Sequence, residues 1–160
     1  MTTVFRKTYL IFFLLFFLPT PEIFARGVCV SRSKVNLRAK PSSRATITWV
    51  VGRHTPLIFL KQKGNWFHVQ DQDGEKHWVY GTGVTTDYQC TAVNYKYVLL
   101  RKGPNARSGL APFHLADRYT PFRRIERQED WQKVQDQFGA QYWVRYDALW
   151  FPRTMMKVDF

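Results

Sequence analysis

Residues 66–79 read WFHVQDQDGEKHWV, and residues 131–144 read WQKVQDQFGAQYWV. Both stretches fit the pattern W-x-x-V-Q-D-Q-x-G-x-x-x-W-V without a gap, so the chain carries an internal duplication. In the first copy, Asp73-Gly74 is a strong signal for a tight turn between two β-strands. The sequence therefore predicts two equivalent β-hairpins, one in each of two small domains.

The flanks of the two hairpins match as well. Residues 35–38 correspond to residues 98–101, and residues 53–56 correspond to residues 118–121. The offset is 63 between Pro41 and Pro104 and grows to 65 between Pro56 and Pro121. The second copy thus has two extra residues in its first long loop, within residues 105–113, where insertions are tolerated.

The remaining patterning favours short strands. From residue 32 to residue 40 every second side chain is polar and mostly basic, which predicts that residues 28–37 form a half-buried strand with a basic outer face. Further strands are expected at residues 47–51, 57–60 and 88–93, with a loop or single helical turn at 81–86. Residues 153–158 align with the segment around Cys90 and are expected to form a last strand. Sustained helical periodicity is absent, so we predict an all-β protein.

Composition and charge limit the class of protein. The 160 residues are 45% hydrophobic and 17% aromatic, which argues against a disordered chain. Lys and Arg number 24 against 12 Asp and Glu, a formal net charge of +12. Such a surplus bears on partners and solubility rather than on fold.

The first 25 residues have the pattern of an export signal. Arg6 and Lys7 precede an entirely apolar run at residues 9–18, and two prolines and Ala25 follow. A membrane span needs about 20 apolar residues, so we expect cleavage after Ala25 rather than anchoring, and no transmembrane segment after cleavage. The predicted division is a signal peptide at 1–25 and domains at 26–93 and 94–160. Export implies a periplasmic or secreted protein.

Two cysteines, Cys29 and Cys90, lie in the part expected to be exported. An even count in an oxidising compartment predicts a disulfide between them. Cys29 lies just ahead of the first copy and Cys90 just after it, so we expect the bridge to hold the first and last strands of that domain together. Closing such a loop would stabilise the fold by roughly 4 kcal/mol.

At this point the residues support a family resemblance. The order N-L-R-x-x-P at residues 36–41, Pro56 before an apolar strand, and N-W-x-x-V with D-G and W-V at residues 65–79 resembles the exported, tandem type of bacterial SH3-like domain. The second copy is similar. The resemblance implies two small SH3-like β-barrels of five to six strands each, and recognition of cell-wall material or a targeting role. The family usually has Gly before the second Trp, where this chain has His77 and Tyr142.

Aromatic residues are the main binding candidates. The first Trp of each pair, Trp66 or Trp131, is expected to fill a core. The second Trp and its neighbours suit a partly exposed shelf for sugar or peptide. The candidate ligand-binding residues are Trp78, Tyr80, His77, Trp143, Tyr142 and Tyr146.

A basic patch is the second candidate. It consists of Arg32, Lys34, Arg38, Lys40 and Arg44, with no acidic residue among them. It is either a solvated edge that discourages aggregation or an attraction site for anionic polymer. Basic charge with aromatic residues also describes nucleic-acid binders, but export argues against nucleic acid as the partner.

Catalysis and metal binding have weaker support. His68 and His77 could approach each other across the hairpin, but their counterparts are Lys133 and Tyr142, and no third ligand is evident, so we expect no metal site. Asp71 and Asp136 occur in the matched V-Q-D-Q, where the favoured interpretation is capping of turn amides. We therefore predict a non-enzymatic envelope module without cofactors, which binds a peptidoglycan-type glycan or peptide or, alternatively, docks a specific envelope protein.

Overall fold

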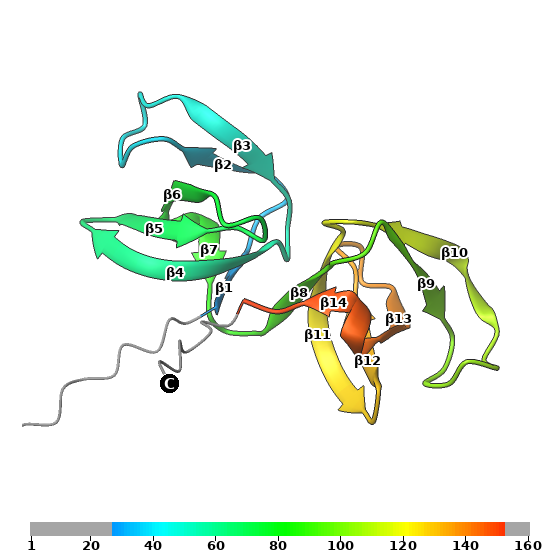
Figure 1. Ribbon diagram of the computed structural model, residues 1–160. Coiled ribbons are helices and arrows are strands. Elements are labelled where there is room, and N and C mark those ends of the chain that lie inside the picture. The colour runs from blue at the N-terminus through cyan, green and yellow to red at the C-terminus, as the bar shows by residue number, and fades with distance from the viewer. Residues whose placement is uncertain (1–26, 153–160) are drawn as a thin grey trace, which may run out of the picture.

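The computed structural model describes residues 27–152, which form two antiparallel sheets of seven strands each (Figure 1). The first sheet contains β1 (Gly27–Val30), β2 (Val35–Arg38), β3 (Ile47–Val51), β4 (Pro56–Lys63), β5 (Trp66–Gln70), β6 (Lys76–Tyr80) and β7 (Val84–Thr85). The second contains β8 (Cys90–Val93), β9 (Tyr97–Arg101), β10 (Leu110–Asp117), β11 (Pro121–Gln128), β12 (Trp131–Gln135), β13 (Gln141–Arg145) and β14 (Leu149–Trp150). Single 3-10 turns, η1 (Gly81–Gly83) and η2 (Tyr146–Ala148), precede β7 and β14. The all-β prediction is confirmed.

The two sheets have the same topology. The strand order is β3-β2-β6-β5-β4-β1-β7 in the first and β10-β9-β13-β12-β11-β8-β14 in the second. Each strand of one copy therefore has an equivalent in the other, as the duplicated sequence predicts. The count is seven per sheet rather than five or six because the two-residue strands β7 and β14 complete the pairing of β1 and β8. The predicted signal peptide and a strand at 153–158 lie outside the described residues.

Alternation along the strands builds one core in each domain. Inward side chains of the first domain include Leu37, Leu57, Val69 and Val79, all buried. The equivalent positions of the second are Leu100, Phe122, Val134 and Val144. Because successive side chains of a strand face opposite sides, the side chains between these inward ones form a second, outward face on each hairpin. Among residues 27–152, the structure contains no helix of the length and apolar character that a membrane span requires.

A matched tight turn anchors the first strand of each domain. His54 and Tyr119 adopt left-handed conformations, with φ of 70° and 71°. The backbone N–H of His54 donates to the carbonyl of Val30 at 2.8 Å, and that of Tyr119 donates to the carbonyl of Val93 at 3.0 Å. Left-handed backbone is costly for a residue with a Cβ, so it persists only where surrounding bonds hold it. The matched R-x-T-P segments of the sequence are these turns.

The predicted strand at residues 28–37 is interrupted. β1 pairs with β4 and β7, whereas β2 pairs with β3 and β6, so the chain must change direction between them. The N–H of Ser31 donates to the carbonyl of Gly83 at 2.9 Å, which ties the turn to η1. Arg32 and Lys34 consequently lie in a loop and not on one face of a strand.

The predicted Cys29–Cys90 disulfide is present, with the two Cα atoms 5.9 Å apart. Its expected role is wrong. β8, which carries Cys90 and was expected to belong to the first domain, pairs with β11 and β14 of the second sheet. Cys29 lies on the first strand of the first domain and Cys90 on the first strand of the second. The bond therefore joins the two domains instead of closing one of them.

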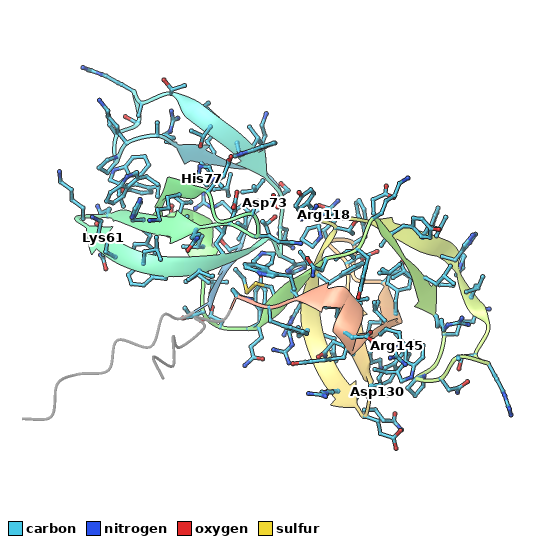
Figure 2. The ribbon with its side chains drawn as sticks, in the orientation of Figure 1. Lys61, Asp73, His77, Arg118, Asp130 and Arg145 are labelled. Carbon is cyan, nitrogen blue, oxygen red and sulfur yellow. A yellow bond between two sulfur atoms is a disulfide. The ribbon has the colours of Figure 1, made fainter. Side chains whose placement is uncertain are left out.

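Polar contacts supplement the disulfide. Arg118 Nη2 of the second domain lies 3.1 Å from Asp73 Oδ1 of the first (Figure 2). Gln72 Nε2 donates to the carbonyl of Val93 at 3.2 Å and to Asn94 Oδ1 at 3.1 Å. Most of these atoms belong to exposed side chains, for which such bonds contribute little. The disulfide is the one covalent constraint on how the described domains are arranged, apart from the chain itself.

We predict that the double variant Cys29→Ala/Cys90→Ala keeps both sheets but loses the fixed arrangement of the domains. Each sheet has its own core, whereas the contacts between domains are few and exposed. The radius of gyration from small-angle X-ray scattering should rise, while the far-UV circular dichroism spectrum stays that of the wild type. Loss of the β-sheet spectrum would show instead that the fold of a single domain requires the bridge.

Candidate functional site

The duplicated aspartates organise the two hairpin turns. Asp71 Oδ1 accepts hydrogen bonds from the N–H groups of Asp73 at 3.0 Å and Glu75 at 2.9 Å. Asp136 Oδ1 accepts equivalent bonds from Phe138 and Ala140, both at 2.9 Å. Gly74 and Gly139 complete the turns with φ of 88° and 94°, values that glycine adopts without strain. The turn interpretation of the repeated V-Q-D-Q is confirmed.

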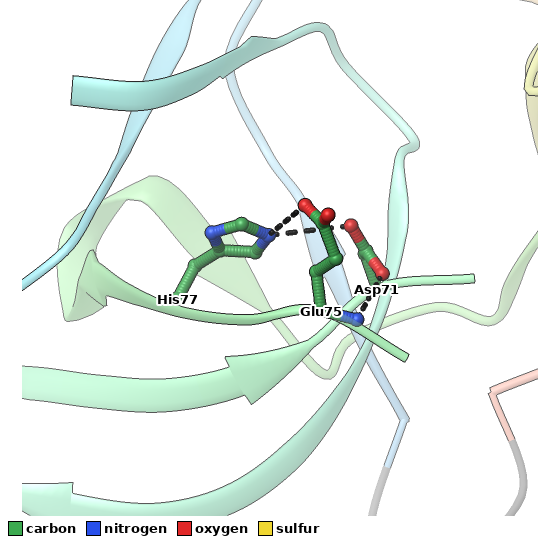
Figure 3. Close-up of side chains that lie close together, drawn as sticks. All are labelled: Asp71, Glu75 and His77. Carbon is green, nitrogen blue, oxygen red and sulfur yellow. Dashed lines mark hydrogen bonds and ion pairs between the residues drawn. The ribbon is translucent and has the colours of Figure 1, made fainter. Parts of the chain in front are cut away.

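The second oxygen of each aspartate braces a buried ring. His77 Nε2 lies 3.2 Å from Asp71 Oδ2 (Figure 3). Thr48 Oγ1 lies 2.9 Å from the other ring nitrogen. In the second domain the hydroxyl of Tyr142 donates to Asp136 Oδ2 at 3.2 Å, and burial together with the charge of Asp136 raises the pKa of this hydroxyl. His77 and Tyr142, at 3% and 8% exposure, belong to the inward parity of their strands. Tyr142 is therefore not part of an exposed shelf.

Asp71, Glu75 and His77 place three possible ligand atoms within 4.8 Å of one another. Each atom already has a protein partner, since Glu75 Oε2 accepts from Trp49 Nε1 at 3.2 Å. The pairing of His68 and His77 considered from sequence is wrong. The register sets His68 opposite Trp78 and His77 opposite Val69, so the two imidazoles face opposite sides of the sheet.

We expect Asp71→Ala and Asp136→Ala to lower the free energy of unfolding, each by about 2 kcal/mol, as expected for loss of hydrogen bonds to a charged group. Exposed Asp87, replaced in the same way, is the control and should change stability little. Chemical denaturation monitored by tryptophan fluorescence measures the difference. Unchanged stability in both variants would contradict the turn-capping role.

The outward face of the first hairpin carries a row of rings between basic side chains. Cross-strand pairing across β4, β5, β6 and β2 aligns Lys61, His68, Trp78 and Arg38 in that order. The His68 and Trp78 rings lie against each other with centroids 4.6 Å apart and planes tilted by 30°. Burial, followed by nearby Lys61, lowers the pKa of His68, which keeps its ring neutral against Trp78 at neutral pH.

A second row lies beside the first. Trp66 pairs with Tyr80 in register, and their rings meet edge to face at 5.3 Å. Asn65 Nδ2 donates to the exposed hydroxyl of Tyr80 at 3.2 Å. The expected place of Trp66 in the core is wrong, because its ring lies on the outward face against that of Tyr80. We call Trp66, His68, Trp78 and Tyr80 the aromatic face. Its neighbours Lys61, Lys63 and Lys76 are exposed and have no acidic partner among the described residues.

In the second domain the equivalent face is covered by cations. Lys133 replaces His68 and lies 5.7 Å from the Trp143 ring, and its ammonium is 3.5 Å from Glu126. Arg145 replaces Tyr80, lies 6.0 Å from the Trp131 ring and pairs with Asp147 at 2.8 Å. Both Trp rings of this domain are consequently buried. The expected exposure of Trp143 is therefore wrong, and the accessible aromatic face belongs to the first domain alone.

The predicted basic patch divides into a clamp and a loop surface. Arg38 Nη1 donates to the carbonyl of Ala45 at 2.6 Å, and its equivalent Arg101 donates to the carbonyl of Ser108 at 2.8 Å, so both close the first long loop of their domain. The other four members are exposed in loops around β2: Arg32, Lys34, Lys40 and Arg44. Arg38 nevertheless joins this basic surface to the aromatic face, because it lies next to Trp78.

Tyr146 lies apart from the other candidates. It follows β13 in η2, and its ring stacks on that of Phe151 with centroids 4.5 Å apart. The Arg127 guanidinium carbon lies 3.8 Å from the centroid of the Tyr146 ring. The structure therefore brings Trp78 and Tyr80 together on one face and leaves His77, Tyr142, Trp143 and Tyr146 elsewhere.

An open groove lies between the two domains, with a volume of about 1230 Å³, and the sequence does not predict it. The first domain contributes the end of β3 and the turn at residues 71–73, and the second contributes β10, the start of β11 and the turn at residues 136–142. The available signal was a pair of large apolar residues, Phe113 and Leu115, which both line the groove.

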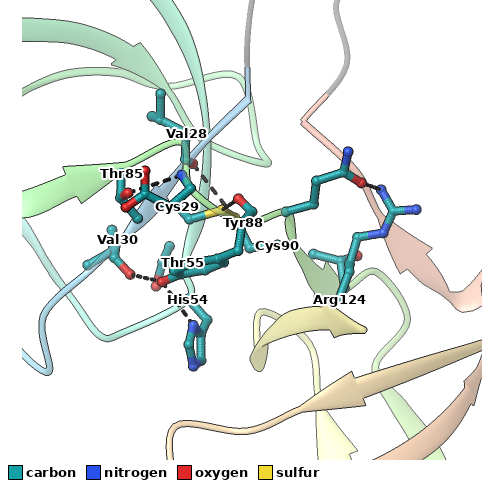
Figure 4. Close-up of a disulfide and its surroundings, with 12 residues drawn as sticks. Val28, Cys29, Val30, His54, Thr55, Thr85, Tyr88, Cys90 and Arg124 are labelled. Carbon is teal, nitrogen blue, oxygen red and sulfur yellow. Dashed lines mark hydrogen bonds between the residues drawn. A yellow bond between two sulfur atoms is a disulfide. The ribbon is translucent and has the colours of Figure 1, made fainter. Parts of the chain in front are cut away.

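A buried polar cluster lies next to the disulfide (Figure 4). The Tyr88 hydroxyl donates to the carbonyl of Val30 at 3.1 Å and lies 3.0 Å from His54 Nδ1. Burial lowers the pKa of His54, helped by the charges of Arg53 and Arg123 and opposed by Asp136 of the other domain. Burial likewise raises the pKa of Tyr88. Both groups are thus neutral at neutral pH.

We predict that His54 makes the protein less stable in acid. Its pKa in the folded state is below the unfolded value of about 6.5, so the unfolded chain binds more protons once the pH falls below that value. The free energy of unfolding should decrease from about pH 7.5 to about pH 5.5, and less steeply in His54→Asn, a residue that tolerates left-handed backbone. Exposed His114→Asn is the control. Equal slopes in wild type and His54→Asn would contradict the prediction.

Comparison with known protein families agrees with this geometry. Two family models, each described as the bacterial SH3 domain, match residues 33–85 and residues 94–150. The chain belongs to the bacterial SH3 domain family. It contains two such domains in tandem, as the sequence resemblance predicts. Bacterial SH3 domains are generally cell-wall-binding modules and usually not catalytic. With the intramolecular disulfide, the two domains fit an extracytoplasmic protein.

Several solved structures resemble the tandem distantly. They include an NlpC/P60 family protein from Bacillus cereus ATCC 10987, with 12% identity and a TM-score of 0.37 over 81% of this chain and 57% of that one. NlpC2 and NlpC1 from Trichomonas vaginalis have 11% and 10% identity, and each has a TM-score of 0.35. Those matches cover 84% and 88% of this chain and 49% and 50% of theirs. The chain thus spans about half the length of these proteins. No curated protein matches it.

Proposed function

We propose that this protein is a non-enzymatic binding module of the cell envelope that recognises peptidoglycan-type glycan or peptide through the aromatic face of its first domain. The export signal expected at residues 1–25 would place it in the periplasm or outside the cell. The main support for this proposal is that the two domains differ on this face. The Trp66 and Trp78 rings are partly exposed beside His68 and Tyr80, whereas the Trp131 and Trp143 rings are buried beside Lys133 and Arg145.

The chemistry of the aromatic face suits such a ligand. Trp and Tyr rings offer flat apolar surface, and their N–H and O–H groups remain available for hydrogen bonds. The basic side chains at its margins, Lys61, Lys63 and Arg38, attract anionic groups of a polymer at longer range. Stacking would supply affinity that salt does not remove, and the basic margin would supply a part that salt weakens.

We expect the purified protein to be retained on isolated sacculi in about 0.5 M salt, a concentration that screens exposed charges. Trp78→Ala and Tyr80→Ala should each weaken retention about tenfold, which corresponds to roughly 1.4 kcal/mol. Phe138→Ala is a matched control, because this ring is 87% exposed but lies on the second domain. A co-sedimentation titration at low salt and at about 0.5 M salt measures the effect.

Three outcomes would contradict the proposal. The first is absence of retention by the wild-type protein at low salt. The second is retention that about 0.5 M salt abolishes, which would leave only non-specific charge attraction. The third is an equal loss in Phe138→Ala and Trp78→Ala.

A further inference from the structure

The groove between the domains is a second surface, separate from the aromatic face. Several of its apolar side chains come from β3 and β10, which are the terminal strands of the two sheets. Trp49 and Val50 of β3 and Leu115 of β10 are more than half exposed, and Phe113 of β10 is 80% exposed. Large apolar side chains that cluster in the open on a small protein mark an interaction site.

Both contributing strands also have an edge that pairs with no other strand among residues 27–152. A terminal strand presents backbone N–H and C=O groups without partners, which can pair with another extended chain. In each case the end of the strand, at Val51 and at Asp117, approaches the junction of the two domains (Figure 1). The groove therefore has apolar walls and backbone edges in the same place, the combination used to bind a peptide in extended form.

The charge of the groove is opposite to that of the chain. Its lining includes four aspartates, Asp71, Asp73, Asp117 and Asp136, and none of the lining residues is Lys, Arg or His. The whole chain has twice as many basic as acidic residues. Arg118 neutralises Asp73 from the rim, whereas Asp117 has no ion pair among residues 27–152. A ligand with positive charge is favoured here and an anionic wall polymer is not.

We propose that the groove docks an extended segment of a partner protein that carries Lys or Arg beside apolar residues. The segment adds a strand along the free edge of β10. Its apolar side chains contact Phe113, Leu115 and Trp49, and its cation pairs with Asp117. The volume of about 1230 Å³ exceeds the roughly 1,000 Å³ upper range of small-ligand sites and suits several side chains.

The disulfide prepares this site for binding. One wall of the groove belongs to each domain, and the Cys29–Cys90 bond fixes the first strands of both. A site whose walls are already in place avoids the entropy cost of assembling them around the ligand. The inference stands on the groove alone and does not rest on wall binding by the aromatic face.

The test is a selection from phage-displayed random peptides of about 12 residues, which span roughly 40 Å when extended. Peptides are selected on the purified protein and counter-selected on its Phe113→Ser variant. We expect the enriched peptides to contain Lys or Arg next to apolar residues. The most enriched peptide, labelled with fluorescein, should bind Phe113→Ser and Asp117→Asn at least about tenfold more weakly than wild type by fluorescence anisotropy.

Matched controls replace similar residues away from the groove. Ile125→Ser changes an exposed apolar residue of β11, and Asp87→Asn changes an exposed acid of the linker. Neither should alter peptide affinity. Because Phe113 and Asp117 are exposed, their variants should keep the wild-type melting curve, and both should be retained on sacculi as the wild type is. Trp78→Ala should bind the peptide normally, so this inference and the proposed function fail separately.

Several results would overturn the inference. They are a selection without enrichment, enriched peptides that lack basic residues, or affinity that Asp117→Asn leaves unchanged. Displacement of the peptide by soluble wall fragments would assign the groove to wall recognition. A dimer by light scattering that Phe113→Ser dissociates would assign the groove to a second copy of the chain.

Discussion

The disulfide between Cys29 and Cys90 is the constraint on which the arrangement of the molecule depends. It joins β1 to β8, the first strand of each domain. Each of these strands is itself held by a left-handed turn, at His54 and at Tyr119, and by pairing to a long strand. A covalent bond between two strands that are each held in their own sheet restrains how the two sheets are oriented relative to each other. The exposed polar contacts across the junction would not do so alone.

The two domains serve as an internal comparison. Features present in both copies are those that the fold requires: the turn aspartates, the glycines that follow them, and the arginine clamps at Arg38 and Arg101. Features that differ are free to carry function. His68 and Tyr80 leave their tryptophans accessible, whereas Lys133 and Arg145 cover theirs and are themselves paired with acids. One scaffold thus has a binding face in one copy and a closed face in the other.

Charge separates the two candidate surfaces. Basic side chains surround the aromatic face and the loops near β2, and aspartates line the groove. Opposite fields on one small protein favour different ligands and disfavour exchange between the sites, because an anionic ligand is repelled where a cationic one is attracted. A module that contacts a polymer on one side and a protein on another can connect the two.

Much of the fold could be predicted from local pattern. The repeated hairpin, its turn aspartates and the strand at Ile47–Val51 follow from alternation and turn chemistry, which depend on residues near in sequence. The pairing of Cys29 with Cys90 follows from the cysteine count, because the chain has no other cysteine. The basic patch was only partly predictable, since alternation continued across residues 31–34, where the chain changes sheet partners. Alternation of polar and apolar residues does not show where the chain stops pairing with one strand and begins to pair with another.

The sequence by itself determined two β domains of one design, their turns and their covalent bond. Tertiary structure decided what that bond connects, because strand order, and not position along the chain, assigns β8 to the second sheet. It also decided that Tyr142 and Trp143 are buried, since a cation or a carboxylate from another part of the hairpin covers or braces each ring. The groove belongs to neither domain alone. Its walls are brought together only when two separately folded sheets are fixed against each other, a long-range relation that local residue patterns do not encode.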